Sequence, residues 1–394
     1  MGNNWKILGS ELNDPDVAKG LENSLNGLII GEKDYDSVLK GLKYPEFLQK
    51  TTAEKAGTYD NQPNPGHEKN DKGHLGDPLF KNLFPEGKQI EKFDLSPNFG
   101  TEIEGVQLSE LNDAAKNDLA LFLETRGLAV FRKQDFRDKG PGFATEFGKY
   151  FGPLHIHPVS YSAQGYPEIF TTIRKGGDGS RYDAVFQRKS KDIAWHSDIS
   201  FEEYPASFSF FVALEAPPSG GDTVFIDLRE AYRRLSPSFQ KYLETLTVVH
   251  SNLYQRKAAE IRGQLLKIKD VSTHEHPLVR THPVTGEKSL YFSRGFIQKI
   301  KGLKSEESDA ILSFLEDHVT NNPELQVRAS HRGTESGTVI AWDNRFLLHT
   351  ATSDFLQYAT GPRHHFRLTV LGEKPYLAEE NKQNESENER PRAY

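Results

Sequence analysis

The sequence predicts a mainly β domain with flanking helices, whose core is a jelly roll, also called a double-stranded β-helix. From residue 195 onward, apolar residues alternate over many short segments that Gly, Pro, Asn and Asp separate. Only a few segments carry apolar residues at helical spacing. Many short strands with long insertions favour two facing sheets with helices packed outside them.

The regular part is expected to begin near Gly100. Residues 101–108 alternate like a half-buried strand. Residues 112–126 are expected to form a helix, because Asn112 suits an N-cap and Gly127 suits a helix end. The apolar run that follows Gly127 predicts a short buried strand, and residues 143–151 predict a second helix.

The second half is expected to be richer in strands. A hairpin turn is expected at residues 284–287, within the strand pair 278–292. Further strands are expected at residues 207–214, 222–226, 247–250, 326–330, 338–342 and 365–371, and helices at 229–246 and 305–320.

Three regions follow from composition. Residues 1–95 are expected to be an irregular N-terminal extension, because 51–78 is rich in Asn, Gly, Asp, Lys and Pro. Residues 96–376 are expected to form the folded domain. Residues 377–394 are charged without periodicity and are expected to be a disordered tail.

Composition excludes several function classes. Among 394 residues, 36% are hydrophobic and the net charge is −7, so the basic excess of a nucleic-acid-binding protein is missing. No apolar run approaches the length of a transmembrane helix, and no membrane partner is expected. The chain has no cysteine, so any metal must be held by nitrogen and oxygen. The N-terminus lacks a signal-peptide pattern, and we expect a cytoplasmic protein.

The segment Trp195-His-Ser-Asp198 is the central motif. On an extended segment, His196 and Asp198 leave the same face and supply two ligands of a metal site. His349 is the candidate third ligand, which the jelly roll can bring close. Two His and one carboxylate on one side of an ion are typical of non-heme Fe(II) oxygenases. The alternative is that the His-x-Asp triplet is a chance occurrence with a hydrogen-bonded imidazole.

Two arginines form a second pattern. Arg363 and Arg367 are four residues apart on an expected strand, so both point to one face, the inside of the barrel. Because an unpaired buried charge is costly, two inward arginines indicate anionic ligands. Arginine suits planar, bidentate contact with a carboxylate. The alternative is that both reach solvent at a strand end. Thr223, after Gly220-Gly221-Asp222, offers a hydroxyl to an anion, but a tight hairpin explains this segment equally well.

These motifs together resemble one family. The chain is similar to the Fe(II)/2-oxoglutarate-dependent dioxygenases of the TauD/TfdA (taurine dioxygenase) family, especially the fungal sulfonate dioxygenases. The likeness covers about residues 99–376. The motifs that carry it are Trp195-His-Ser-Asp198, Pro218-Ser-Gly-Gly-Asp-Thr223, residues 276–284 (HPLVRTHPV), Trp342-Asp-Asn-Arg345 with His349, the Arg363 and Arg367 pair, and residues 151–158 (FGPLHIHP).

The resemblance implies Fe(2+) as cofactor, with 2-oxoglutarate and O2 as co-substrates. The implied roles are iron ligation by His196, Asp198 and His349, 2-oxoglutarate binding by Arg363 and Thr223, contact with the substrate's anionic group by Arg367 and His157, and an aromatic wall from Phe296.

Two positions depart from the taurine-using members. Asp192 stands where they have Asn, and Ser160 stands where they have Tyr. The smaller Ser160 enlarges the substrate site, whereas Asp192 adds negative charge. We therefore expect a longer or differently substituted sulfonate rather than taurine.

The implied reaction hydroxylates a small anionic organosulfonate at the carbon next to sulfur, which releases sulfite and an aldehyde for sulfur assimilation. Alternatives are the same chemistry on an alkyl sulfate, an aryloxyacetate or an amino acid, and a non-catalytic cupin-like binding barrel. The relatives also point to a homo-oligomer.

Overall fold

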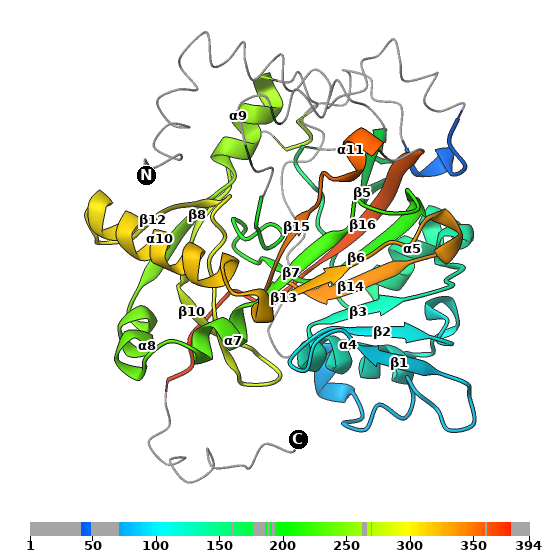
Figure 1. The fold of residues 1–394 in the computed structure, drawn as a ribbon, viewed down its shortest axis with the longest axis horizontal. Coiled ribbons are helices and arrows are strands. Elements are labelled where there is room, and N and C mark those ends of the chain that lie inside the picture. The colour runs from blue at the N-terminus through cyan, green and yellow to red at the C-terminus, as the bar shows by residue number, and fades with distance from the viewer. Residues whose placement is uncertain are drawn as a thin grey trace.

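An eight-stranded sheet forms the centre of the part of the chain that the computed structural model describes, namely residues 41–48, 71–159, 161–175, 186, 190, 194–261, 266–268, 270–358 and 361–379 (Figure 1). The order of its strands is β1 (Glu91–Asp94), β2 (Thr101–Glu104), β3 (Leu128–Phe131), β14 (Val339–Asp343), β6 (Ala206–Glu215), β16 (Pro362–Leu371), β5 (Tyr166–Lys175) and β4 (Tyr161–Ala163). All neighbouring pairs are antiparallel except β2 and β3.

Three smaller sheets accompany the main sheet. Their strand orders are β13 (Gln326–Ala329), β7 (Thr223–Asp227) and β15 (Leu347–Ala351); β12 (Ile297–Ile300), β8 (Thr247–Ser251) and β9 (Thr273–Pro277); and β10 (Val279–Thr281) with β11 (Lys288–Leu290). The α-helices of the described residues are α4 (Asp113–Arg126), α5 (Gly140–Lys149), α7 (Leu228–Arg233), α8 (Pro237–Glu244), α9 (Leu253–Ile261), α10 (Ser305–Thr320) and α11 (Phe355–Tyr358).

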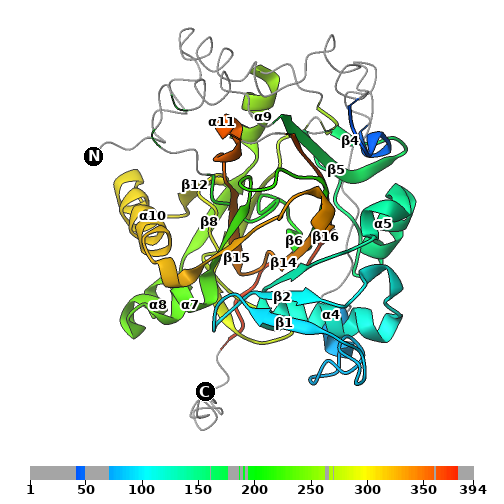
Figure 2. The same cartoon turned by 45° about the vertical axis from the view of Figure 1, so that its right-hand side comes forward.

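The two faces of the main sheet have different partners. On β6, Phe208, Phe210 and Val212 belong to the apolar core shared with α4 and α5. Phe211 points the other way, into a core shared with β7 and β13. There the Phe225 ring lies 5.4 Å from the Trp342 ring. The alternation along β6 thus separates an outer layer of helices from an inner layer between two sheets (Figure 2).

Helix α4 has the boundaries that its sequence predicts. The Asn112 side chain accepts a hydrogen bond from the Ala115 amide at 2.9 Å, which caps the first turn. Gly127 ends the helix with φ of 75°, and its amide donates to the Leu123 carbonyl at 2.7 Å. A residue with a side chain is strained at this φ, which explains why a glycine occupies position 127.

Other elements differ from the sequence expectation. The helix expected at 229–246 is two helices, α7 and α8, because Pro237 has no amide to continue the first and instead starts the second. Within the described residues, β-structure begins at β1 rather than near Gly100, since Glu91–Asp94 pairs with β2, and short 3-10 helices at Pro45–Phe47 and Lys72–Leu75 precede it. The expected hairpin is present as β10 and β11. Strands β1, β4, β5, β9, β12 and β15 and helices α9 and α11 were not predicted.

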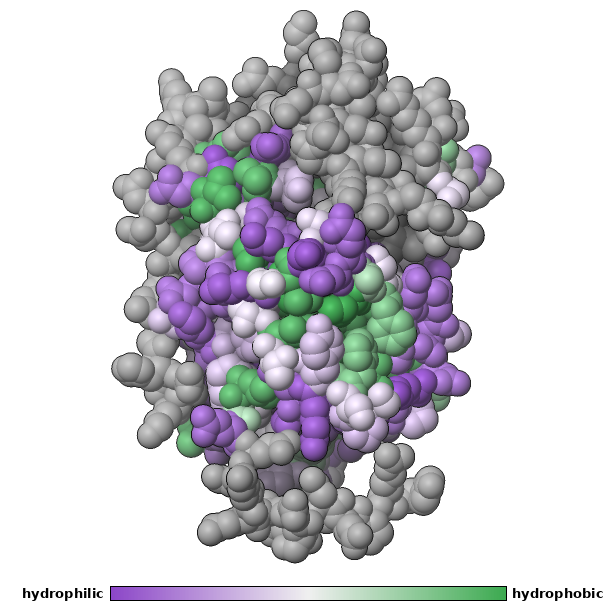
Figure 3. All heavy atoms as spheres, turned by 90° about the vertical axis from the view of Figure 1, so that its left-hand side faces the viewer, coloured by the Kyte–Doolittle hydropathy of each residue, from purple (hydrophilic) through white to green (hydrophobic). Residues whose placement is uncertain are grey.

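Helices α8 and α10 lie on the face shown in Figure 3, where hydrophilic and hydrophobic residues are mixed and a hydrophobic patch occupies the centre. Tyr242 of α8 and Phe314 of α10 are exposed, and both rings contact Phe239. None of the helices in the described residues is long and apolar enough to cross a membrane.

Candidate active site

A short backbone bridge joins the two histidines of the candidate metal site. The His196 amide donates to the His349 carbonyl at 3.0 Å, and the His349 amide donates back to the His196 carbonyl at 2.8 Å. His349 lies in β15, opposite Phe225 of β7. The two imidazole rings therefore lie side by side, with centroids 4.2 Å apart.

Asp198 follows in a turn rather than on a strand, and Ile199 takes a left-handed conformation there, with φ of 47°. Asp198 Oδ1 lies 3.7 Å from His196 Nε2 and 3.5 Å from His349 Nε2. Each of the three residues thus offers one donor atom, and these atoms lie within 4.8 Å of one another.

Both imidazoles are suited to bind a metal. His196 Nδ1 lies 2.6 Å from the Ala194 carbonyl, which can only accept, so the proton is on Nδ1 and Nε2 keeps its lone pair. Burial lowers the pKa of His196, and it lowers the pKa of His349 well below the ordinary value. Both rings are therefore neutral near pH 7, which is the form that binds a metal.

The Asp198 carboxylate is held in one orientation from behind. Ser209 Oγ donates to Asp198 Oδ2 at 2.6 Å, and Asn344 Nδ2 donates to Ser209 Oγ at 2.9 Å. The Asn344 side-chain oxygen accepts from the Asp198 amide at 3.2 Å and from Trp342 Nε1 at 2.9 Å. These bonds leave Oδ1 turned toward the two imidazoles.

The charge of Asp198 is also set by its neighbours. Burial raises the pKa of this carboxyl, but the charges of Arg367, His349 and His196 and the Ser209 hydrogen bond outweigh burial and lower it to about 2. The carboxylate is therefore ionised at neutral pH. Two ligand atoms that are each about 2.1 Å from one ion lie roughly 3 to 3.6 Å apart. The separations of Asp198 Oδ1 from the two imidazole nitrogens, 3.7 and 3.5 Å, are close to this range, so the residues fit one ion held by nitrogen and oxygen.

Arg367 has a partner that sequence reasoning missed. We expected an inward guanidinium without a nearby acid, but Arg367 Nη1 lies 2.7 Å from Asp198 Oδ1. The guanidinium also lies 4.6 Å from the centre of the Phe170 ring, and the His157 ring is 4.6 Å from the same Phe170 ring. Arg367 and His157 are therefore joined through Phe170, at the edge of the candidate metal site.

Arg363 lies at another position on β16. Its Nε donates to the Gly221 carbonyl at 2.7 Å, and its Nη1 lies 3.2 Å from His365 Nδ1. Among the described residues its hydrogen-bond partners are these neutral groups, and burial, with the charge of Arg174, lowers the pKa of Arg363 to about 9. Thr223 begins β7, two residues beyond Gly221. The buried cation and the start of β7 thus lie next to each other.

The remaining predicted residues divide into two groups. Phe296 is buried, and its ring contacts the His196 ring edge-on at 6.1 Å. Ser160 and Asp192 lie outside the described residues, so their expected effects on the substrate stay predictions.

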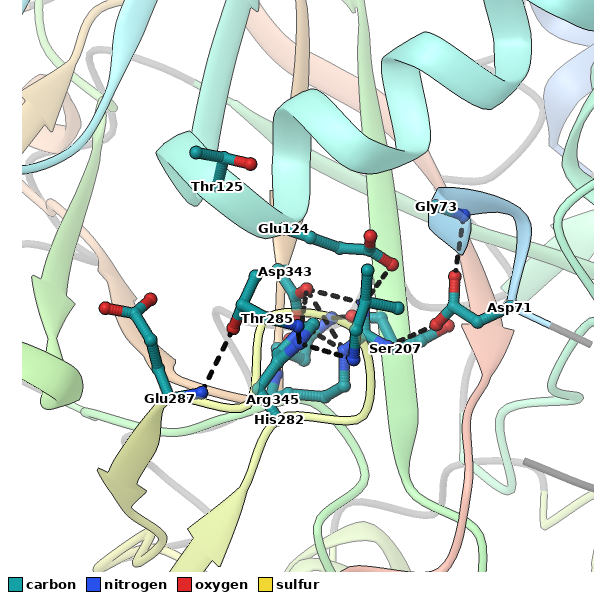
Figure 4. A network of polar contacts seen from close by, with 12 residues as sticks. Asp71, Gly73, Glu124, Thr125, Ser207, His282, Thr285, Glu287, Asp343 and Arg345 are labelled. Carbon is teal, nitrogen blue, oxygen red and sulfur yellow. Dashed lines mark hydrogen bonds and ion pairs between the residues drawn. The ribbon is translucent and has the colours of Figure 1, made fainter. Parts of the chain in front are cut away.

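A buried ionic network supports the turn between β14 and β15 (Figure 4). Arg345 is fully buried and contacts Asp343, Glu124 and Asp71, and His282 lies 3.0 Å from Asp343. Burial and the charge of Asp71 raise the pKa of Glu124 well above its ordinary value. Through Asp71, a segment of the expected N-terminal extension packs against the residues that lead to His349.

The comparisons with known proteins agree with this geometry. The sequence profile described as "Taurine catabolism dioxygenase TauD, TfdA family" matches residues 91–369. The chain belongs to the TauD/TfdA family. A protein of Saccharomyces cerevisiae named "Alpha-ketoglutarate-dependent sulfonate dioxygenase" is 39% identical over 368 residues, covering 91% of this chain and 86% of that protein. A Pseudomonas putida protein named "Alpha-ketoglutarate-dependent sulfate ester dioxygenase" is 31% identical over 307 residues, covering 74% of this chain and 92% of that protein.

Solved structures give the same result. A taurine dioxygenase from Burkholderia xenovorans superposes with a TM-score of 0.58 at 29% identity, over 73% of this chain and 91% of that chain. The predicted jelly-roll core and the predicted family are thereby confirmed. This TauD/TfdA member is an oxidoreductase, a dioxygenase that depends on 2-oxoglutarate, also called alpha-ketoglutarate, and on O2.

Proposed function

We propose that this dioxygenase oxidises a small organosulfonate at the carbon next to sulfur, with Fe(II) held by His196, Asp198 and His349. The observation that carries the proposal is the cluster of three donor atoms within 4.8 Å, two neutral imidazoles and one ionised carboxylate. The name of the yeast relative supports a sulfonate as the substrate class. Contribution to sulfur assimilation is part of the same proposal.

The protein's part in the reaction is binding and orientation. Fe(II) with 2-oxoglutarate and O2 would supply oxidation of a C–H bond, while 2-oxoglutarate becomes succinate and carbon dioxide. Arg363, with the Thr223 hydroxyl, would bind the far carboxylate of 2-oxoglutarate, because this buried guanidinium has only neutral partners in direct contact. The Ser209 and Asn344 hydrogen bonds would keep Asp198 Oδ1 directed at the metal.

Arg367 and His157 would bind the anionic group of the substrate. Because Arg367 also contacts Asp198, a sulfonate on its guanidinium lies beside the metal, and the adjacent carbon is the one within reach. Hydroxylation of that carbon gives a 1-hydroxysulfonate. Its C–S bond then breaks as the hydroxyl loses its proton, and the products are an aldehyde and sulfite.

A panel of alkanesulfonates tests the proposal by sulfite release and succinate formation. We expect one sulfite for each succinate with at least one sulfonate, and none without Fe(II). Succinate without sulfite over the whole panel would contradict the proposal. Release of sulfate from alkyl sulfates instead would support the second candidate, a sulfate ester dioxygenase, which the Pseudomonas putida relative favours.

Three expectations about the whole protein are also part of the proposal. They are the domain limits of 96–376, a cytoplasmic location, and assembly into a homo-oligomer. The net charge of −7 supports a protein without nucleic-acid partners.

A further inference from the structure

Lys267 is a buried cation that the proposed function does not use. Only 5% of the residue is exposed, and its Nζ is buried without a hydrogen-bond partner among the described residues. Its backbone amide donates to the Pro158 carbonyl at 2.8 Å, which places it beside the segment that carries His157. A buried ammonium without a partner is costly, so its presence needs an explanation.

The charge of Lys267 acts on the substrate side of the site. Burial lowers the pKa of His157 well below its ordinary value, and the charges of His155, Arg367 and Lys267 lower it further. His157 is therefore a neutral group on which the charges of both Arg367 and Lys267 act. Its ring contacts Phe170, which also contacts Arg367. Lys267 thus belongs to the same cluster as the expected anion-binding residues.

The two cations come from different parts of the chain. Arg367 lies in β16 and its Nη1 is 2.7 Å from Asp198 Oδ1, whereas the Lys267 amide donates to the Pro158 carbonyl, next to His157. Burial lowers the pKa of Lys267 to about 8, and the charge of the partly exposed Glu168 acts against burial. Arg367 thus contacts a metal ligand directly, and Lys267 lies beside the segment that carries His157.

We propose that Lys267 binds a second acidic group at the far end of the substrate, so that the site takes organosulfonates that also carry a carboxylate. The inference rests on the proposed function. The sulfonate lies on Arg367 beside the metal, where oxidation occurs, and the distal carboxylate accepts a hydrogen bond from the Lys267 ammonium. Contact with an anion also removes the cost of burying this cation. The negative charge of Glu168 stabilises the ammonium of Lys267 from a distance, but Glu168 makes no hydrogen bond to its Nζ.

Two matched series of compounds test the proposal. One contains sulfocarboxylates from sulfoacetate to 6-sulfohexanoate, and the other contains the alkanesulfonates of the same carbon number. For each pair, the ratio of the two KM values is measured in the wild type and in Lys267→Met, which keeps the length of the side chain and removes its charge. At the preferred chain length we expect the ratio to shift about 10- to 100-fold against the sulfocarboxylate, the usual effect of losing a charge-assisted hydrogen bond.

A pH series gives a second measurement that does not depend on the folding of Lys267→Met. The ammonium is present below its pKa, so the wild type should lose its preference for the sulfocarboxylate as the pH rises from 7 to 9. Lys267→Arg should keep the preference, because a guanidinium stays charged over this range. His157 is neutral throughout, so it does not produce this change.

The outcomes separate the two proposals. If the wild type releases sulfite from no member of either series, the proposed function is wrong. If the wild type releases sulfite but the KM ratios are the same in Lys267→Met and do not change with pH, only the inference on Lys267 is wrong. In that case the charge of Lys267 interacts with Glu168 rather than with the substrate.

Discussion

Ser209→Ala isolates the support of the candidate metal ligand from the ligand itself. Ser209 Oγ donates to Asp198 Oδ2 at 2.6 Å and accepts from Asn344 Nδ2 at 2.9 Å, and all three residues are buried. The substitution removes one donor to a buried carboxylate and leaves the Asn344 amide with a longer contact of 3.4 Å, to the Ser207 carbonyl. The variant keeps all three metal ligands.

The size of the effect follows from these bonds. A hydrogen bond to a charged group contributes about 1.5–3 kcal/mol to stability, so we expect Ser209→Ala to lower the free energy of unfolding by about this amount. A partner that orients a metal ligand typically accounts for about 10- to 100-fold in metal affinity. We therefore expect the Kd for Fe(II) to rise about 10- to 100-fold, because Asp198 Oδ1 is no longer held toward the imidazoles.

Anaerobic calorimetric titration with Fe(II) measures this change. Ser207→Ala is the matched control, because its hydroxyl lies in the same strand and contacts the Val370 carbonyl at 3.4 Å rather than Asp198. We expect Ser207→Ala to bind Fe(II) like the wild type. If Ser209→Ala bound Fe(II) within twofold of Ser207→Ala, the support assigned to Ser209 would be refuted.

Three more predictions concern the site and its pH dependence. Asp198→Ala should abolish iron-dependent succinate formation, and retained turnover would reject its role as a ligand. Arg363→Met should mainly raise the KM for 2-oxoglutarate, whereas Arg367→Met should mainly raise the KM for the sulfonate; the reverse pattern would exchange the two assignments. Eight histidines of the described residues have a lowered pKa in the folded state, with burial as the largest cause. The unfolded chain therefore binds protons first as the pH falls below about 6.5, and each histidine removes up to about 1.4 kcal/mol of stability per pH unit. Urea unfolding of the metal-free protein should show a much lower midpoint at pH 5 than at pH 7, and equal midpoints would contradict this reasoning.

Local signals in the sequence predict the elements that depend on local chemistry. Helix α4 is an example, because its cap at Asn112 and its end at Gly127 are set by neighbouring residues. The pair His196 and Asp198 is found by its spacing, and His349 is a candidate that the expected jelly roll can bring close and that the resemblance to the family supports. The exact geometry differs, since Asp198 lies in a turn and a backbone bridge, not a continuous strand, places His196.

Contacts between distant segments were not predictable in the same way. The ion pair of Arg367 with Asp198 joins β16 to a turn about 170 residues earlier, and no local pattern indicates it. Lys267 stands in the stretch Gln264-Leu-Leu-Lys-Ile-Lys-Asp270, which suggests an exposed charge. Its burial results from packing against the segment of Pro158, which the sequence alone does not indicate.

Anomalous X-ray scattering at the iron edge, from crystals grown anaerobically with Fe(II), tests the central claim most directly. We expect one strong peak at about 2.0–2.2 Å from His196 Nε2, His349 Nε2 and Asp198 Oδ1. A peak that lies away from these three atoms, or no peak in crystals of a protein that binds one equivalent of iron in solution, would contradict the account.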